Sequence, residues 1–341
     1  MVIVMKNGSS REDLARVARS VQELGFRAHV LPGVQRTVVG VTGNPGPLDP
    51  GLFERLAGVA RAVPITQPYK LASREMKLDD TVVRLGKRSI GDGGLFVIAG
   101  PCAVEGEEQV LQTAQQMKLA GADALRGGAF KARSSPYSFQ GMGRDGLILL
   151  AKAREATGLP IVTEALDEAS LELVAEFADV VQIGARNMQT DEHLKRVGRL
   201  NKPVLLKRGM SATLDELLLS AEYLLAEGNA NIILCERGIR TFSRHSRFTL
   251  DLSVVPAVRA LSHLPIFVDP SHATGRHERV ADMARAAVAA GASGVMLEFH
   301  PSPETAQSDG RQALLPREAF ELFGQLRAIA AIVARKAEAV R

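Results

Sequence analysis

Residues 203–236 read PVLLKRGMSATLDELLLSAEYLLAEGNANIILCE, and this stretch contains the pattern that decides the fold. Two short apolar runs, PVLLK (203–207) and NIILCE (231–236), flank an amphipathic segment, Leu214–Ala226. Short continuous apolar runs are typical of strands buried on both faces, and the segment between them has the length and spacing of a helix. The stretch therefore predicts a strand, a helix and a second parallel strand.

The same pattern repeats in both directions along the chain. Apolar runs alternate with amphipathic segments such as Glu107–Ala120 and Arg276–Ala290. Eight runs occur: LFVIAG (95–100), ALRGG (124–128), IVTEA (161–165), VVQIG (180–184), PVLLK (203–207), NIILCE (231–236), PIFVD (265–269) and GVMLE (294–298). Eight strand–helix units predict a closed (β/α)8 barrel, the TIM-barrel form of the α/β class. An open doubly wound sheet is the alternative, but it needs fewer strands and usually a glycine-rich first turn.

A different pattern precedes the barrel. Residues 1–66 predict a small βαββαβ domain of the ferredoxin-like type. Its expected strands are Val2–Met5, Arg27–Leu31, Thr37–Val41 and Ala62–Thr66, and its expected helices are Ser10–Leu24 and Pro50–Gly58. Ser9 or Ser10 would cap the first helix and Asp49 the second. A polar linker over 67–80 leads to the barrel at 81–341, which begins with a hairpin over Thr81–Ile90.

The composition narrows the function classes. The chain has 341 residues, of which 46% are hydrophobic and 23% charged, so it can bury a large core without disulfides. The net charge is +4 and the basic residues are scattered among acidic ones, which argues against nucleic-acid binding. No apolar run approaches the roughly 20 residues of a membrane span, and the N-terminus resembles a first strand more than a signal peptide. We expect a cytoplasmic protein.

Chemically capable residues follow the predicted strands. Cys102 comes after the first barrel strand, His272 after the seventh, Glu298 ends the eighth, and Asp309 lies in the loop beyond it. The carboxyl ends of barrel strands form one rim, so these four side chains should converge. A thiolate, an imidazole and two carboxylates suit Mn2+, Fe2+, Co2+ or Zn2+ better than Mg2+.

The same rim carries a cluster of cations. Several of them follow apolar strands directly, as in LLK and LCER, where a surface charge has no reason to lie. The cluster comprises Arg126, Lys131, Arg133, Arg186, Lys207 and Arg237. Buried cations need anions, so phosphates and carboxylates are the expected ligands. The loop KARSSPYSFQG (131–141) adds Ser134 and Ser135 as donors.

Other residues receive a plainer interpretation. Cys235 is expected to be packed and not reactive, and His29, His193 and His263 are expected at the surface. His300 follows Glu298 by two residues and could support the metal site. Glu164, His245 and Asp269 are expected on the rim without an assigned role.

Seven motifs resemble one enzyme family. They are AGPCAVEG (99–106), RGGAFKARSSPYSFQG (126–141), QIGARNMQ (182–189), LLKRGM (205–210), LCERGIRTF (234–242), VDPSHATGR (268–276) and EFHPSPETAQSDGRQAL (298–314). They resemble the 3-deoxy-D-arabino-heptulosonate 7-phosphate (DAHP) synthases, in the branch that includes the 3-deoxy-octulosonate 8-phosphate synthases. The resemblance covers nearly the whole chain and also implies a ferredoxin-like or ACT-like regulatory module at the front.

The resemblance implies a role for each site residue. Cys102, His272, Glu298 and Asp309 correspond to the family's metal ligands. The phosphoenolpyruvate contacts fall on Arg126, Lys131, Ala185 through its backbone, Arg186, Lys207 and Arg237. The aldose-phosphate contacts fall on Arg133 and Ser134, with Asp269 near the aldehyde. Lys131, Cys102 and His272 are the residues we expect to act in catalysis.

One position departs from the family's usual sequence. Heptulosonate synthases usually have Lys-Pro-Arg-Thr or Lys-Pro-Arg-Ser in this loop, whereas this chain has Ala132 in place of the proline. Octulosonate synthases usually have Lys-Ala-Asn-Arg-Ser-Ser. The missing Asn and the continuation SPYSFQG favour the four-carbon aldose.

The implied activity is a condensation of phosphoenolpyruvate with erythrose 4-phosphate, the first step of the shikimate pathway. An octulosonate 8-phosphate synthase that uses arabinose 5-phosphate is the alternative. A sensor of sugar phosphates without catalysis is a rival from another class, although it would not need four metal ligands and Lys131. By analogy we expect a homotetramer or homodimer, and an aromatic amino acid, tyrosine or phenylalanine, as effector at the N-terminal domain.

Overall fold

A computed structural model describes residues 1–31, 36–65, 67–133 and 135–339, with the backbone alone for 335–339. The chain divides into two compact units. The first comprises Met1–Asp80 with Ala260–His263, and the second comprises Thr81–Arg259 with Leu264–Arg341.

The first unit contains a four-stranded antiparallel sheet in the order β2-β3-β1-β4. Its elements are β1 (Val2–Met5), α1 (Arg11–Glu23), β2 (Arg27–Leu31), β3 (Val38–Thr42), α2 (Gly51–Glu54) and β4 (Val59–Val63). The βαββαβ order and this strand order confirm the ferredoxin-like fold. Ile3, Met5, Val17 and Phe53 belong to its own apolar core.

Local chemistry explains where helix α1 begins. The Ser10 hydroxyl accepts a hydrogen bond from the Asp13 backbone N–H at 3.1 Å, and the Asp13 carboxylate accepts one from the Ser10 N–H at 3.1 Å. This reciprocal capping box satisfies two N–H groups that a helix start leaves unpaired. The predicted choice between Ser9 and Ser10 is thereby settled in favour of Ser10.

The second predicted helix is much shorter than expected. It spans Gly51–Glu54 in place of Pro50–Gly58, and Gly58, with a φ of 83°, turns the chain into β4. Strand β4 consequently begins at Val59, three residues earlier than predicted. Asp49 accepts a hydrogen bond from the Gly51 N–H at 2.9 Å but lies one residue before the N-cap position, which Pro50 occupies.

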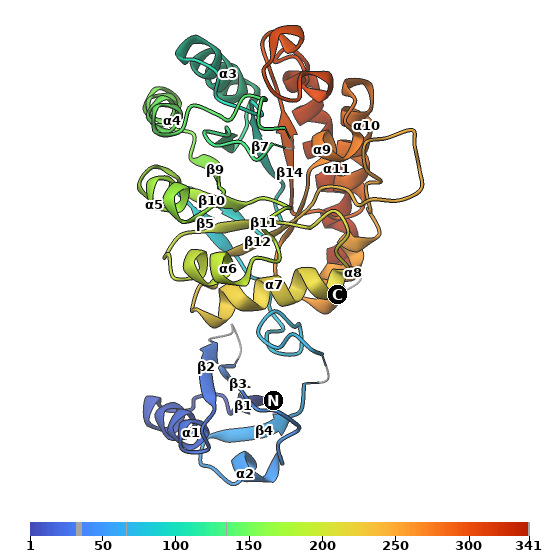
Figure 1. The fold of residues 1–341 in the computed structure, drawn as a ribbon. Helices are drawn as coiled ribbons and strands as arrows, with labels where there is room; N and C mark the ends of the chain where they lie inside the picture. The colour runs from blue at the N-terminus through green and yellow to red at the C-terminus, as the bar shows by residue number, and fades with distance from the viewer. Residues whose placement is uncertain (32–35, 66, 134, 340–341) are drawn as a thin grey trace. The chain divides into compact units, whose positions relative to one another are not determined.

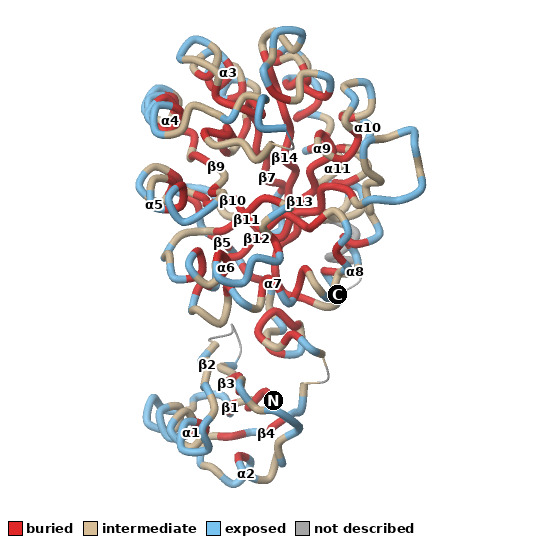
Figure 2. The backbone as a smooth tube through the Cα atoms, in the orientation of Figure 1, coloured by how far each residue is buried: buried red, intermediate tan, exposed pale blue. Residues whose placement is uncertain are grey.

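The second unit is a closed barrel of eight parallel strands, as predicted. Figure 1 shows the strands inside a ring of helices, and Figure 2 shows that they are buried along their length. The strands are β7 (Phe96–Gly100), β8 (Ala124–Arg126), β9 (Ile161–Ala165), β10 (Val180–Ile183), β11 (Val204–Lys207), β12 (Ile232–Glu236), β13 (Ile266–Val268) and β14 (Gly294–Glu298). Each lies within or coincides with a predicted apolar run.

Helices connect the strands around the outside. They are α3 (Glu107–Ala120), α4 (Arg144–Thr157), α5 (Glu168–Phe177), α6 (Asp191–Gly198), α7 (Leu214–Ala226), α8 (Val254–Leu261), α9 (Pro270–Thr274), α10 (His277–Ala289) and α11 (Glu318–Ala339). Two 3-10 turns, η1 (Pro303–Thr305) and η2 (Gly310–Gln312), interrupt the loop between β14 and α11. None of the described helices is long and apolar enough to cross a membrane.

A hairpin seals one end of the barrel. Strands β5 (Val83–Leu85) and β6 (Arg88–Ile90) pair in antiparallel fashion, and Val83 and Ile90 share one apolar cluster with Phe96 and Phe267. Phe96, Ala124 and Val180 belong to the same cluster and are the first residues of β7, β8 and β10. The hairpin therefore covers the amino ends of the strands and leaves the carboxyl ends as the accessible rim.

Candidate active site

The alternation of side chains along each strand places the site residues. Leu205, Cys235, Phe267 and Met296 belong to the apolar cluster inside the barrel. Successive side chains of a strand point to opposite faces, so the residue two positions further on points inward again. Those residues are Lys207, Arg237, Asp269 and Glu298. The same step carries Ala124 to Arg126, Val162 to Glu164 and Val180 to Gln182.

Four predicted metal ligands come together at the rim. One ligand atom each from Cys102, His272, Glu298 and Asp309 lies within 4.8 Å of all the others. Donor atoms bound to one transition-metal ion at about 2.0–2.3 Å can be no more than about 4.6 Å apart, so the cluster is close to the size that one ion needs. The sulfur, nitrogen and oxygen donors fit a divalent transition metal.

The ligand atoms already approach one another closely. The Cys102 Sγ lies 3.2 Å from the Asp309 Oδ2, and the His272 Nε2 lies 3.2 Å from the Glu298 Oε1. Burial, and then the charge of Glu298, raises the pKa of the Cys102 thiol to about 12. Burial would raise the pKa of Glu298, but His272 and Arg126 lower it overall. A cation is the natural means of holding the thiolate form here.

Asp269 orients the candidate histidine ligand. The His272 Nδ1 lies 2.7 Å from the Asp269 Oδ2, and the His272 backbone N–H donates to the Asp269 Oδ1 at 3.0 Å. When Nδ1 donates its proton to Asp269, the Nε2 lone pair is free to face the cluster. Lys207 also donates to the Asp269 Oδ2 at 2.5 Å. Asp269 is fully buried and is not among the residues that line the pocket, so its predicted substrate contact stays a prediction.

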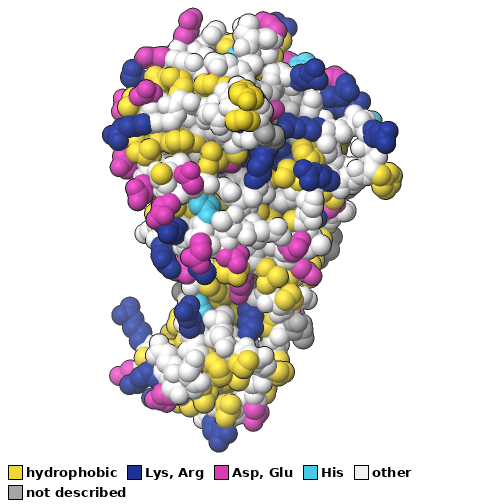
Figure 3. Space-filling view, viewed as in Figure 1, with side chains coloured by type: hydrophobic (Ala, Val, Ile, Leu, Met, Phe, Trp, Pro, Cys, Tyr) yellow, Lys and Arg dark blue, Asp and Glu magenta, His cyan; other side chains and the backbone are white. Residues whose placement is uncertain are grey.

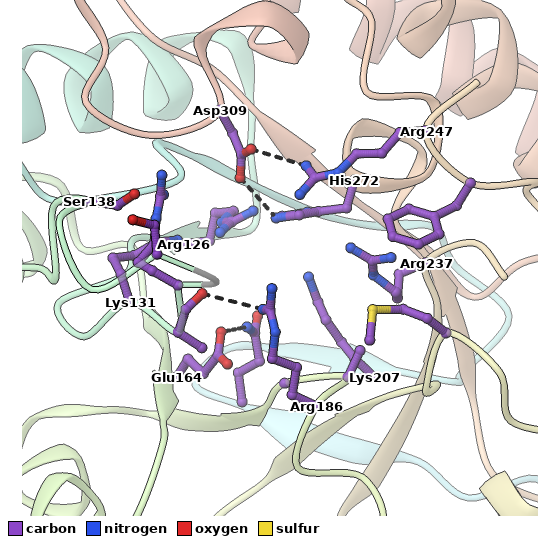
Figure 4. A pocket seen from close by; sticks show the side chains of 18 residues that line it. Arg126, Lys131, Ser138, Glu164, Arg186, Lys207, Arg237, Arg247, His272 and Asp309 are labelled. Atoms are coloured by element: carbon purple, nitrogen blue, oxygen red, sulfur yellow. Dashed lines mark hydrogen bonds and ion pairs between the residues drawn. The ribbon is translucent and has the colours of Figure 1, made fainter. Parts of the chain in front are cut away.

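The pocket beside the cluster is strongly cationic. It encloses about 270 Å³, and seven of its lining side chains are basic: Arg126, Lys131, Arg133, Arg186, Lys207, Arg237 and Arg247. Figure 4 shows Arg186, Lys207 and Arg237 pointing into the same space that His272 and Asp309 face. Ala185 lines the pocket as well. Ser134, predicted to contact the aldose phosphate, lies outside the described residues.

Arg237 is placed to bind an anion. Its Nη1 atom is buried and has no hydrogen-bond partner among the described residues. The guanidinium lies over the Phe248 ring at 4.4 Å from the ring centroid. Burial lowers the pKa of Arg237, and Asp269 opposes this effect. An unsatisfied buried donor is costly, and an anionic ligand in the pocket would satisfy it.

Lys131 connects the cationic pocket to the metal cluster. Its Nζ donates to the Cys102 carbonyl at 2.9 Å and to the Cys102 Sγ at 3.0 Å. Burial would lower the pKa of Lys131, but its interaction with the Cys102 sulfur raises it above the ordinary value. Arg126 is tied to the same cluster, because its Nη1 donates to the Glu298 Oε1 at 2.8 Å.

The structure adds four residues that the sequence did not single out. Gln312 donates to the Glu298 Oε2 at 2.6 Å, and the Ser271 hydroxyl accepts from the Glu298 backbone N–H at 3.1 Å. Arg247 donates to the Asp309 Oδ1 at 3.0 Å. Gln182 donates to Glu164 at 2.9 Å within the pocket. Gln182 could have been found from the sequence, because it lies two residues after the inward-facing Val180. Gln312 and Arg247 lie in long loops, where side chains do not alternate between two faces as they do in a strand.

Two expected surface histidines are buried instead. His193 is 6% exposed and His263 is 4% exposed. His193 lies on the inner face of α6, beside Leu194 and Val197. The His263 ring Nε2 lies 2.7 Å from the Leu71 carbonyl oxygen. A neutral ring that donates to this carbonyl has a hydrogen-bond partner although it is buried. Cys235 is fully buried in the barrel cluster, as expected.

Fold and site together define a (β/α)8-barrel protein with a cation-lined pocket next to a candidate metal centre, preceded by a ferredoxin-like unit. The chain belongs to the DAHP synthetase I family, which matches residues 74–331. Residues 1–67 match the DAHP synthase ferredoxin-like domain.

Relatives and solved structures agree with this membership. The chain is 50% identical over 326 residues to the phospho-2-dehydro-3-deoxyheptonate aldolase of Thermotoga maritima, covering 96% of this chain and 95% of the relative. A crystal structure of that Thermotoga maritima aldolase, a DAHP synthase, aligns over 98% of each chain with a TM-score of 0.78 and 47% identity. The 2-dehydro-3-deoxyphosphooctonate aldolase of Magnetococcus marinus is 34% identical, covering 69% of this chain and 87% of the relative.

Proposed function

We propose that this chain is a DAHP synthase that joins phosphoenolpyruvate to erythrose 4-phosphate and releases inorganic phosphate. The observation that carries the proposal is the 50% identity to the Thermotoga maritima aldolase over both units of the chain. The octulosonate aldolase of Magnetococcus marinus covers 69% of this chain. Cytoplasmic location and assembly as a homotetramer or homodimer belong to the same proposal.

The cationic pocket supports the assignment of phosphoenolpyruvate. That substrate carries a carboxylate and a phosphate, and Arg126, Lys131, Arg186, Lys207 and Arg237 line one cavity that can hold both anions. The backbone of Ala185 is proposed to add a further contact. Arg133, which lines the same pocket, is proposed to bind the aldose phosphate together with Ser134. Convergent cations also orient the two substrates for attack.

The proposed reaction forms a carbon–carbon bond first and releases inorganic phosphate last. The methylene carbon of phosphoenolpyruvate forms a bond to the aldehyde carbon, and Lys131 donates a proton to the oxygen that becomes negative. Water adds to the second carbon of phosphoenolpyruvate, and the resulting hemiketal phosphate loses inorganic phosphate by cleavage of its carbon–oxygen bond. Cys102, His272, Glu298 and Asp309 would hold Mn2+, Fe2+, Co2+ or Zn2+, which supplies a Lewis acid for the aldehyde oxygen. His272 is kept in position by Asp269.

The test measures phosphoenolpyruvate consumption with erythrose 4-phosphate or arabinose 5-phosphate, before and after chelation and return of Mn2+. We expect turnover with the four-carbon sugar, loss with the chelator and recovery with Mn2+. Turnover with arabinose 5-phosphate alone would assign the chain to the octulosonate branch. The absence of turnover with either sugar would favour a sugar-phosphate sensor.

A further inference from the structure

A second cavity lies beside the active-site pocket, on the other side of Arg247 and Asp309. It encloses about 770 Å³, and three segments line it: the loop after β12, the turn between α9 and α10, and η2. Arg247 and Asp309 line both cavities. Their ion pair, with 3.0 Å between Arg247 Nη1 and Asp309 Oδ1, therefore forms the wall between them.

The second cavity carries uncompensated positive charge. Four of its lining residues are arginines: Arg244, Arg247, Arg276 and Arg311. Its two acidic residues are Asp309, which pairs with Arg247, and Glu278, which lies 3.8 Å from Arg276. Within the described part of the chain, the side chains of Arg244 and Arg311 form no ion pair. Figure 3 shows Lys and Arg side chains gathered on this face of the barrel unit, with few acidic groups among them.

The loop that supplies Arg244 and Arg247 is held in place. The Arg247 N–H donates to the Thr274 carbonyl at 3.2 Å, and the Phe248 N–H donates to the Ala273 carbonyl at 2.8 Å. Arg279 donates to the Ser246 hydroxyl at 3.2 Å. Gly275 has a φ of 63°, and a Cβ there would lie 2.7 Å from the Arg247 Cβ. These bonds and this close packing hold the backbone that carries Arg247 against the turn between α9 and α10.

The residues that line the second cavity indicate which class of ligand it can bind. Apart from Gly275 and Gly310, the residues that line the cavity carry charged or polar side chains; His245 contributes an imidazole ring, and no Phe or Tyr is among them. Such a lining offers little apolar surface for the ring of an aromatic amino acid, and it favours an anionic ligand instead. Arginines on three segments match a compact anion with several acceptor oxygens, and a phosphate group is the best fit.

We propose that this cavity is a second phosphate-binding site, separated from the reacting groups by the Arg247–Asp309 pair. Its occupant is either the phosphate of an incoming sugar phosphate or the inorganic phosphate that leaves. Only this choice of source rests on the proposed function. Phosphate binding itself requires no turnover, so its test is independent of the activity assay.

The experiment titrates the full-length protein with inorganic phosphate by calorimetry at constant ionic strength. The test variant is Arg244→Gln with Arg311→Gln, both exposed and outside the proposed catalytic residues. The matched control is Arg84→Gln with Lys87→Gln, which removes the same charge from the exposed β5–β6 hairpin. We expect one class of phosphate sites to weaken about tenfold, equivalent to about 1.4 kcal/mol, in the test variant alone. An unchanged isotherm, or equal weakening in the control, would overturn the proposal.

Steady-state kinetics of the same variants separate the two sources. A higher KM for the aldose phosphate, with unchanged inhibition by inorganic phosphate, identifies an incoming substrate. Weaker inhibition by inorganic phosphate with an unchanged KM identifies the leaving product. In both cases the effect should diminish with rising salt, because exposed charges are screened.

Discussion

Cys102 and Cys235 are both buried thiols at the carboxyl ends of barrel strands, but they have different neighbours. Cys102 lies within 4.8 Å of three other potential metal ligands, whereas Cys235 packs in the apolar interior of the barrel. Replacing Cys102 by Ser should reduce metal affinity by at least about a hundredfold, because serine is a poor ligand for soft divalent ions. Chelator competition with bound metal measured in solution checks this, and activity should fall with metal content.

Cys235→Ser is the matched control for that substitution. It removes an equally buried thiol from the neighbouring apolar layer and should leave metal affinity unchanged. Metal retention by the Cys102 variant, or equal loss in both variants, would contradict the assignment of Cys102 as a ligand.

His263 predicts a pH dependence for the first unit. Burial lowers its pKa from 6.5 to about 4, although the Leu71 carbonyl partly opposes this. Between these pH values the unfolded chain binds a proton that the folded chain does not, so stability is lost as the pH falls below about 6.5. The loss should approach about 3 kcal/mol near pH 4, and urea unfolding of the first unit at several pH values measures it.

His263→Gln tests whether this residue is the cause. Glutamine can still donate a hydrogen bond to Leu71 but does not titrate in this range. The variant should therefore lose less stability than the parent chain between about pH 7 and about pH 5. An equal loss in both would place the effect in other groups.

At the scale of elements, strands β11 and β12 are joined by a buried charge network just outside the pocket. Arg208 donates to Glu236 and to Asp251, both at 2.9 Å, and Glu236 is fully buried. Glu236 also accepts from the Gly238 N–H at 2.6 Å. The network therefore holds both ends of the loop that carries Arg237 and Arg247.

Removing the charge of Glu236 should destabilise the barrel strongly. Glu236→Gln leaves Arg208 buried with a weaker partner, which should cost about 3 kcal/mol of the free energy of unfolding. Glu227→Gln is the comparison, because the Arg199–Glu227 pair lies at the surface, where solvent screens it, and its loss should cost far less stability. Urea unfolding of both variants measures the loss of stability. Similar losses in the two variants would show that the buried network contributes no more to stability than a surface ion pair.

At the scale of the whole molecule, each unit has its own apolar core. Removing residues 1–66 should thus leave a folded barrel that is active and insensitive to tyrosine or phenylalanine. Inhibition assays on both forms test this, and equal sensitivity would show that the effector acts elsewhere.

The sequence by itself determined the barrel and most of its rim. Apolar runs at the spacing of strands require burial on both faces, and only a few architectures provide it. Once the barrel is known, a step of two residues beyond each buried side chain leads to Arg126, Lys207, Arg237 and Glu298. The N-terminal fold also followed from the order of its elements, although the local turn at Gly58 shortened its second helix.

Only the tertiary structure decided the contacts that loops make. Gln312 approaches Glu298 from a long loop, and Arg247 reaches Asp309 from another loop, so neither pairing follows from a sequence period. The burial of His263 and His193 was missed for the same reason, since their neighbours come from distant segments or from the inner face of a short helix. Periodic patterns specify which face of an element is buried, but folding alone determines which distant side chains meet.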